Sequence, residues 1–347
     1  MDKYAIIFGG ESYEHEISIV SAITIKGIVN SDLVFIFCND EHRFYLVDRD
    51  KMRAKYFSSG DYKKDSEEIY LKKGGFYKKS LLKEKRVEFD KAINLIHGKD
   101  GEDGVMASLL DFFGVEYIGP RVEASVISYN KELTKLYANS KGVEVLPYQV
   151  IQKDEDQKIT LSFPLIIKPL RLGSSIGLSV VESENDLEYA LDVAFEFDDT
   201  VLVEPFYKDI KEYNIAGIKT KEGFIHSIIE EPFKKGFLDF DKKYLDFSSS
   251  QTRKEANLEE SVKEDIVNAF DKIYSNVFEG AIIRCDFFLM DGKVYLNEIN
   301  PIPGSLANYL FSDFSDVLDK ISKNLPRKRE IRADYRYINS INAAKCK

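Results

Sequence analysis

Short apolar runs alternate with helix-like segments over residues 1–120, and this alternation constrains the fold more than any other feature. The runs Tyr4–Phe8, Leu33–Phe37 and Ala92–Ile96 have the length of buried strands. The segment that follows the first run carries apolar residues at near-helical spacing. Strands that alternate with helices build a parallel sheet, whose ligands bind beyond the carboxyl ends of the strands. We therefore expect an α/β fold with a Rossmann-like N-terminal domain.

Polar loops follow the first and last of these strands and are the first candidate site segments. ESYEHE (Glu11–Glu16) follows the first run, and HGKDGEDG (His97–Gly104) follows the last. Residues 51–85 between them are rich in lysine and weakly patterned, so they predict no element. A helix is expected over Val105–Phe113.

Two further units are expected after Gly119-Pro120. In the second, Asn130 can cap a helix over Lys131–Ser140. Ser183 can start another helix as part of a capping box that has Asp in place of Glu, and this helix is expected to run to about residue 197. The third unit has two strands over residues 212–232, a helix over residues 258–277 and a hairpin whose turn is Asp291-Gly292.

Composition excludes several classes of protein. An apolar share of 44% over 347 residues implies folded cores and two or three domains. A net charge of −10 gives no electrostatic basis for binding nucleic acid or an anionic membrane. Three cysteines without a CxxC motif indicate neither a disulfide framework nor a zinc site. No apolar run has the length of a signal peptide or a membrane span, so a cytoplasmic protein is expected.

The stretch PLRLGSSIG (Pro169–Gly177) has the features of a phosphate-binding loop. Its glycines permit a tight turn whose N–H groups can surround an anion, and Ser174 and Ser175 add hydroxyls. Lys168 precedes the loop, whereas a Walker A lysine follows its glycines, and the dinucleotide motif GxGxxG is missing. Taken alone, the stretch could equally be a polar turn between two strands.

Four polar side chains interrupt the apolar strands of the C-terminal hairpin. Arg284 and Asp286 share one face of the first strand, and Glu298 and Asn300 share one face of the second. Two carboxylates and an amide oxygen suit Mg²⁺, which binds few protein ligands together with substrate phosphates. The alternative is a solvated sheet face with a cross-strand ion pair, but the apolar neighbours would leave those charges half-buried. Together with Lys168 and its loop, the hairpin predicts a nucleoside triphosphate site without a Walker motif.

The chain resembles the ATP-grasp superfamily and, within it, the D-alanine–D-alanine ligases. The matching segments are GGESYEHEIS, HGKDGEDG, IGP, NKELTK, PLIIKPLRLGSSIG, VLVEPF, DKKYLDF, RCDFF and NEINPIPG. Each is weak alone, but their order over nearly the whole chain is specific. The resemblance implies a Rossmann-like parallel-sheet substrate domain (residues 1–120) and a two-part ATP-grasp (α+β) module. Its parts are a central subdomain (121–205) and a C-terminal domain (206–347) with the metal site and a lid loop at 234–250.

The resemblance also implies a role for each site residue. Catalytic roles fall on Glu14, Ser174, Tyr244 and Arg284, of which the first three form a hydrogen-bonded triad. ATP would be bound by Lys131, Lys168, Ser174, Ser175, Glu204, Glu212 and Lys243. The substrates would contact Glu14, His97, Arg284, Gly304, Ser305 and Tyr309. Two Mg²⁺ or Mn²⁺ ions would be held by Asp286, Glu298 and Asn300.

The implied reaction joins two D-alanine molecules at the expense of ATP, through a D-alanyl phosphate, for peptidoglycan precursor synthesis. A homodimer is implied. Tyr309 departs from the family pattern, because a small hydroxyl residue commonly meets the second substrate there. Three alternatives stay open. They are a ligase with another second substrate such as D-lactate or D-serine, a non-catalytic nucleotide-binding ATP-grasp protein, and a dehydrogenase, which the missing GxGxxG disfavours.

Overall fold

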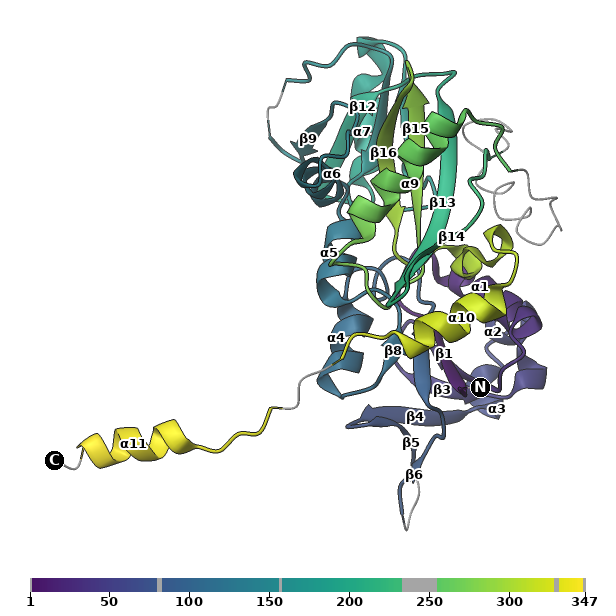
Figure 1. The fold of residues 1–347 in the computed structure, drawn as a ribbon, viewed down its shortest axis with the longest axis vertical. Coiled ribbons are helices and arrows are strands. Elements are labelled where there is room, and N and C mark those ends of the chain that lie inside the picture. The colour runs from purple at the N-terminus through teal and green to yellow at the C-terminus, as the bar shows by residue number, and fades with distance from the viewer. Residues whose placement is uncertain (1, 80–82, 156–157, 233–254, 328–330, 346–347) are drawn as a thin grey trace.

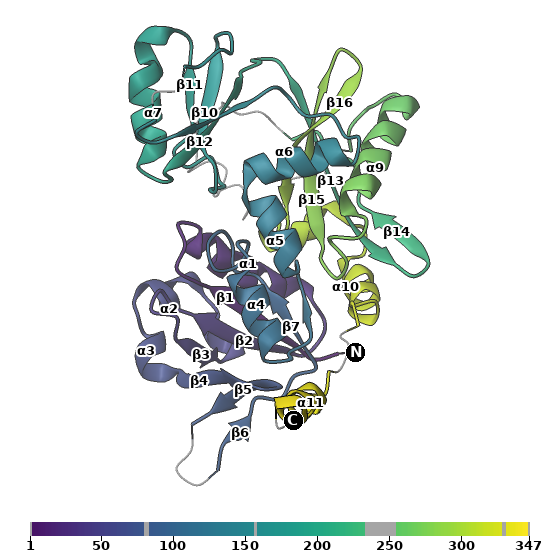
Figure 2. The same cartoon turned by 90° about the vertical axis from the view of Figure 1, so that its left-hand side faces the viewer.

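The computed structural model describes residues 2–79, 83–155, 158–232, 255–327 and 331–345. These residues form one sheet of eight strands and two sheets of four strands. Each sheet comes from its own stretch of the sequence, and Figure 2 shows the eight-stranded sheet below the two smaller ones. The boundaries at residues 120 and 205 lie outside or at the ends of the strands and stay a prediction.

The N-terminal sheet is parallel on one side and antiparallel on the other. β2, β1 and β7 pair in parallel, as predicted, and β8, which was not predicted, adds a further parallel strand. β3 to β6 add antiparallel strands that the sequence did not predict, and β4 and β5 lie within the lysine-rich residues 51–85. Many of the side chains in β4, β5 and β6 stay exposed or half-buried, so no apolar run marks them. The strands are β1 (Tyr4–Gly9), β2 (Leu33–Cys38), β3 (Phe44–Val47), β4 (Glu67–Lys72), β5 (Gly75–Lys78), β6 (Lys85–Arg86), β7 (Lys91–Asn94) and β8 (Tyr117–Ile118).

Helices cover both faces of this sheet. Ile6 belongs to the core shared with α1 (His15–Ile28), and Ile7 to the core shared with α4 (Val105–Phe112). Because successive strand residues face opposite ways, β1 is buried on both sides. Residues 10–14 connect the carboxyl end of β1 to the N-terminus of α1. Shorter helices are η1 (Arg49–Lys51), α2 (Ala54–Ser58) and α3 (Tyr62–Asp65).

The second sheet is antiparallel, with the order β11-β10-β12-β9. The capping box expected at Ser183 is wrong, because that side chain makes no cap hydrogen bond. A 3₁₀ turn, η2 (Glu184–Asp186), intervenes before the helix, so Asp186 takes the N-cap position of α7. The elements are β9 (Gln149–Gln152), β10 (Leu165–Pro169), β11 (Ser179–Val181), β12 (Thr200–Pro205) and α7 (Leu187–Phe195).

The third sheet is also antiparallel, with the order β14-β13-β15-β16. Asn130 caps α6 as predicted, since its Oδ1 accepts the backbone N–H groups of Glu132 (2.9 Å) and Leu133 (3.1 Å). Ala138 of α6 joins the core beneath this sheet. The elements are α5 (Val122–Tyr129), α6 (Lys131–Ser140), β13 (Lys211–Thr220), β14 (Gly223–His226), α9 (Glu260–Tyr274), β15 (Ile283–Met290) and β16 (Lys293–Asn300).

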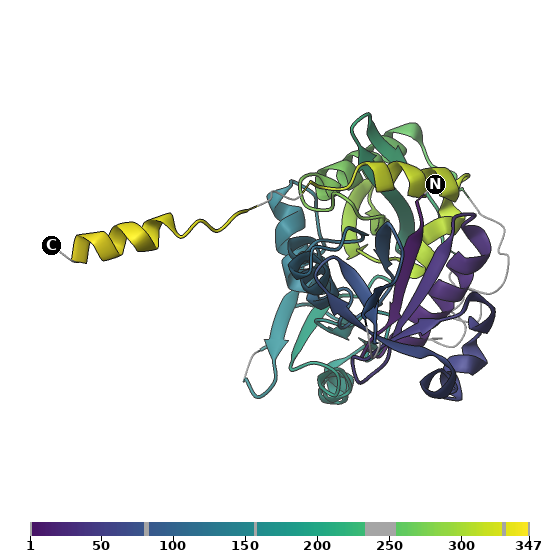
Figure 3. The ribbon, with the colours of Figure 1, turned by 90° about the horizontal axis from the view of Figure 1, so that it is seen from below.

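The last part of the chain returns to the N-terminal domain. Residues of η4 (Gly304–Leu310) and α10 (Phe314–Lys323) share one apolar core with α1 and β1. This core joins the third sheet to the first and fixes the space between them. α11 (Arg336–Lys345) stands apart from the rest (Figures 1 and 3). No helix within the described ranges is long and apolar enough to cross a membrane.

Candidate active site

Glu14 lies just beyond β1, at the N-cap position of α1, and is buried. The hydroxyl of Ser174 donates a hydrogen bond to its Oε1. Burial, together with the charge of Glu102, raises the pKa of Glu14 to about 7. Two of the three residues of the expected triad are thus in contact.

The glycine-serine loop connects two antiparallel strands, β10 and β11, so it is a turn between strands as well as a candidate anion site. Ser174 (φ 58°) and Ser175 (φ 59°) have left-handed backbones. Gly177 (φ 69°) is required, because a Cβ there would lie 2.6 Å from the Phe197 ring and 2.8 Å from Pro169. Backbone N–H groups of such turns can form a concave anion-binding site.

His97 is buried beside Glu14. Its Nε2 lies 2.9 Å from the hydroxyl oxygen of Ser21, and its Nδ1 lies 3.6 Å from Oε1 of Glu102. Burial lowers the pKa of His97 to about 4, so the ring is neutral at pH 7. Burial and the charge of Glu298 raise the pKa of Glu102 to about 8. The charge of Glu298 thus acts on a loop of the N-terminal domain from the C-terminal hairpin.

Two lysines contact Glu204, a buried carboxylate that the sequence predicted for the ATP site. Its carboxylate oxygens lie 2.5 Å from Nζ of Lys135 and 2.6 Å from Nζ of Lys168. The contact to Lys135 is an ion pair that does not meet hydrogen-bond geometry. Burial would raise the pKa of Glu204, but the two lysines outweigh it and hold this pKa at about 2.

Lys131 lies one helical turn before Lys135 on α6, and its Nζ donates to the carbonyl oxygen of Leu172 (2.5 Å). Burial and the charge of Lys168 lower the pKa of Lys131 to about 8. The carboxylate of Glu204 outweighs burial and raises the pKa of Lys168. The charge of Glu212 on β13 also raises the pKa of Lys168. The lysines of the site therefore come from α6 and the second sheet, and the third sheet adds the negative charge of Glu212.

The C-terminal hairpin brings its four polar residues into the predicted register. Arg284 pairs with Asn300, and Asp286 with Glu298, beside a bulge after Asp286. Arg284 donates two hydrogen bonds to Asp286, each 2.7 Å long, from Nε and Nη2. Asn300 donates a third, of 3.1 Å. The hairpin prediction is confirmed by this register.

The polar residues of the hairpin could supply only some of the ligands that a divalent cation needs. No group of three or more His, Cys, Asp or Glu side chains in the described part of the chain is placed to hold a metal. Asp286 and Glu298 supply two carboxylates at opposite positions of the register. Burial and Glu298 raise the pKa of Asp286 against the pull of Arg284, so additional positive charge would stabilise the pair. Mg²⁺ commonly completes such a set with phosphate and water oxygens.

The segment after the hairpin has an unusual backbone. Ser305, Leu306 and Ala307 follow Gly304 with φ of 48°, 55° and 50°. The backbone N–H of Ser305 donates to Oγ of Ser21 (3.0 Å). The hydroxyl of Tyr309 donates to Oε2 of Glu230 (3.1 Å). Burial raises the pKa of Tyr309 to about 12, so this hydroxyl keeps its proton.

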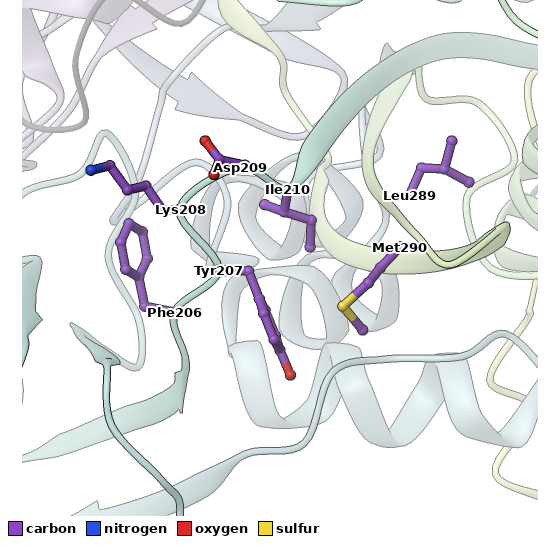
Figure 4. A pocket seen from close by; sticks show the side chains of 7 residues that line it. All are labelled: Phe206, Tyr207, Lys208, Asp209, Ile210, Leu289 and Met290. Atoms are coloured by element: carbon purple, nitrogen blue, oxygen red, sulfur yellow. The ribbon is translucent and has the colours of Figure 1, made fainter.

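A shallow pocket of about 470 Å³ lies at the far end of the hairpin from Arg284 and Asp286. Figure 4 shows its walls, which come from the segment between β12 and β13 and from the end of β15. This segment directly follows Glu204, whereas the charged residues of the site lie toward the start of β15. None of the residues that line the pocket is therefore among the predicted site residues. Its lining residues are Phe206, Tyr207, Lys208, Asp209, Ile210, Leu289 and Met290.

Lys243, Tyr244 and the loop 234–250 lie outside the described residues. Three buried or half-buried site residues were not predicted from the sequence: Glu102, Lys135 and Glu230. The segments HGKDGEDG and NKELTK contain the first two, and the i, i+4 spacing of Lys131 and Lys135 places both on one helix face. No local signal marks Glu230.

Comparison with known proteins agrees with this arrangement. Residues 3–120 match the family model "D-ala D-ala ligase N-terminus", and residues 137–318 match "D-ala D-ala ligase C-terminus". The chain belongs to the D-alanine–D-alanine ligase family. A D-alanine–D-alanine ligase of Nitratiruptor sp. is 59% identical over 343 residues, 99% of each chain. One of Campylobacter jejuni is 55% identical over 345 residues, again 99% of each.

A solved structure gives the same fold. The crystal structure of D-alanine–D-alanine ligase from Helicobacter pylori superposes with a TM-score of 0.85 at 45% identity, covering 95% of this chain and 100% of that one. Family membership confirms the expected fold class, the ATP-grasp type of ligase and a nucleotide site of the ATP-grasp kind. A dehydrogenase is excluded by the same finding.

Proposed function

We propose that this chain joins two D-alanine molecules to D-alanyl-D-alanine, with cleavage of ATP to ADP and phosphate, in peptidoglycan precursor synthesis. The observation that carries the proposal is the hydrogen bond from Ser174 to Glu14. It places a carboxylate suited to an ammonium group beside a loop suited to phosphate. An amino acid held at Glu14 would therefore have its own carboxylate near a bound γ-phosphate.

ATP binds between the two small sheets. Lys131 and Lys168 contact the phosphates, with the backbone of Ser174 and Ser175 around them, because these cations lie where the loop begins. Glu204 borders the adenine and Glu212 the ribose hydroxyls. For Lys243 and Tyr244 we propose the roles that the resemblance implies, a contact to ATP and a part in the triad with Glu14 and Ser174. Exclusion of water is needed because an acylphosphate is readily hydrolysed.

Asp286, Glu298 and Asn300 would hold two Mg²⁺ or Mn²⁺ ions. When bound, these ions offset the negative charge on the transferred phosphoryl group. Arg284 donates two hydrogen bonds to Asp286 and therefore lies beside the proposed metal ligands. Its guanidinium and the N–H of Gly304 stabilise the oxyanion that forms on the acyl carbon.

The reaction has two steps. A carboxylate oxygen of the first D-alanine attacks the γ-phosphorus, and the bond to the ADP oxygen breaks. The amine of the second D-alanine then attacks the acyl carbon, and phosphate leaves. The neutral ring of His97 lies beside Glu14, near the first D-alanine.

The second D-alanine contacts the segment from Gly304 to Tyr309. The Tyr309 hydroxyl is already bonded to Glu230, so Ser305 or a rearranged Tyr309 would meet the substrate carboxylate. A ligase with D-lactate or D-serine as second substrate is the alternative, and the similarity to D-alanine–D-alanine ligases supports D-alanine. We further propose a cytoplasmic homodimer that binds neither nucleic acid nor membrane, consistent with the net charge of −10.

The acylphosphate step is tested with D-alanine labelled with ¹⁸O in its carboxylate. The released phosphate should carry one ¹⁸O atom per dipeptide formed, because the attacking carboxylate oxygen stays with phosphorus. Phosphate without label would contradict attack by the carboxylate. Replacing the second substrate by D-lactate or D-serine in the same assay separates the alternatives by product mass.

A further inference from the structure

Ser21 links two parts of the site that are far apart in sequence. It lies on α1, 2% exposed, and its Oγ accepts the backbone N–H of Ser305 at 3.0 Å. The same oxygen lies 2.9 Å from Nε2 of His97. On its other side, the ring of His97 faces Glu102, whose Oε1 lies 3.6 Å from Nδ1 of the ring. One hydroxyl therefore connects the loop after β7 to the segment after β16.

The segment that Ser21 holds is costly to form. Ser305, Leu306 and Ala307 are consecutive non-glycine residues in the left-handed region, where a Cβ approaches the following carbonyl oxygen too closely. Leu306 and Ala307 are buried in the core shared with α1. Ser21 gives a buried partner to the N–H of the first left-handed residue, which would otherwise be unsatisfied. The bond thus fixes where the left-handed turn begins.

Buried serines on helices usually bond to a carbonyl of the preceding turn. Ser128 on α5 does so, donating to the carbonyl oxygen of Ala124 at 2.7 Å. The hydrogen-bond partners of Ser21 instead come from two other segments. Its position therefore serves the contact between segments rather than the helix itself.

We propose that Ser21 is a positioning residue that couples the His97 side of the first D-alanine pocket to the segment that binds the second D-alanine. This inference rests on the role proposed above for residues 304–309. Ser21 does not touch the reacting atoms. It acts through the N–H of Ser305, which sets the turn next to Gly304, and through the ring of His97.

The test is Ser21→Ala in the full-length chain, with Ser18→Ala as the matched control. Ser18 is also buried on α1, but it accepts the N–H of Gly9 (2.8 Å) and donates to the carbonyl oxygen of Leu95 (2.6 Å), so it binds only the N-terminal sheet. Steady-state rates over a wide range of D-alanine concentration give separate KM values for the first and second D-alanine. The KM for ATP and the Tm are measured on the same preparations.

Ser21→Ala should raise the second KM about tenfold, raise the first KM less, and leave the KM for ATP unchanged. Ser18→Ala should lower the Tm and leave the ratio of the two D-alanine constants unchanged. Ser21→Cys, which keeps the volume but is a weaker acceptor, should be intermediate and serves if the alanine variant does not fold.

A second KM within twofold of wild type in both Ser21 variants would overturn the coupling. So would a parallel rise of all three KM values, which indicates general loosening. Failure of the proposed function looks different, because the wild-type protein itself would then form no dipeptide.

Discussion

Ser174 and Glu14 are 160 positions apart in sequence, yet the hydroxyl of Ser174 donates a hydrogen bond to Oε1 of Glu14. The loop approaches so closely that a Cβ on Gly173 would lie 3.1 Å from Oε1 and 3.2 Å from Oε2. This contact joins the loop between β10 and β11 to the N-terminus of α1. The proposed site depends on it, since it connects the phosphate end to the amino acid end.

Ser174→Ala should raise the KM for D-alanine roughly tenfold, because Glu14 loses a buried hydrogen-bond donor. Ser175→Ala is the matched control, since Ser175 follows in the same left-handed conformation. It should affect the KM for ATP more than that for D-alanine. Equal effects of the two variants on both constants would contradict the separate roles.

The pKa of Glu14 predicts a pH dependence. Its folded-state pKa of about 7 exceeds the usual 4.5, so between these values the folded chain holds a proton that the unfolded chain has lost. The contribution of Glu14 to stability therefore falls as pH rises from 4.5 to 7. Glu14→Gln should gain Tm relative to wild type over this window. No change in the Tm difference with pH would contradict the raised pKa.

Activity should depend on the same group in the opposite sense. Ionised Glu14 is needed to hold an ammonium group, so kcat/KM for D-alanine should rise with pH through about 7. In Glu14→Gln this limb should disappear and the remaining activity should be low. A rising limb that persists in the variant would assign it to another group.

Lys135→Met should destabilise the fold by roughly 3 kcal/mol, because it removes one of two cations that hold the buried carboxylate of Glu204. Thermal unfolding of the variant measures this loss. Lys141→Met, at the end of the same helix, is the control and should change the Tm little. An unchanged Tm in Lys135→Met would show that Lys168 alone suffices for Glu204.

Asp286→Asn and Glu298→Gln should each raise the Mg²⁺ concentration for half-maximal rate by about tenfold or more. Asp291→Asn, at the hairpin turn, is the control because it changes the same residue type away from the site. Mg²⁺ titrations of D-alanine-dependent phosphate release give the three values. If Asp291→Asn shifts the titration as far as Asp286→Asn, the proposed ligand positions are wrong.

Local signals predicted those parts of the fold that depend on local contacts. Asn130 begins α6 and Asp291-Gly292 closes the hairpin, because capping and tight turns involve residues close in sequence. Strand periodicity predicted which polar residues share a face, but the bulge after Asp286, which shifts the register by one residue and sets Asp286 opposite Glu298, was not predicted. The lysine-rich strands β4 to β6 could not be predicted in this way, because many of their side chains are exposed and leave no apolar pattern in the sequence.

Buried charged groups were harder to predict than elements. Lys135 has the sequence context of a solvated helix residue, and only its distant partner Glu204 makes burial favourable. The left-handed turn at Ser305–Ala307 contains no glycine, so the residue types that usually indicate such a turn are missing from the sequence. It is stabilised by tertiary contacts, including the one to Ser21.

The most direct measurement is phosphate release from ATP and Mg²⁺ with and without D-alanine, with the product identified by mass. We expect phosphate release that depends on D-alanine, with one D-alanyl-D-alanine formed per phosphate. Phosphate release that is independent of D-alanine, or ATP binding without dipeptide, would contradict it.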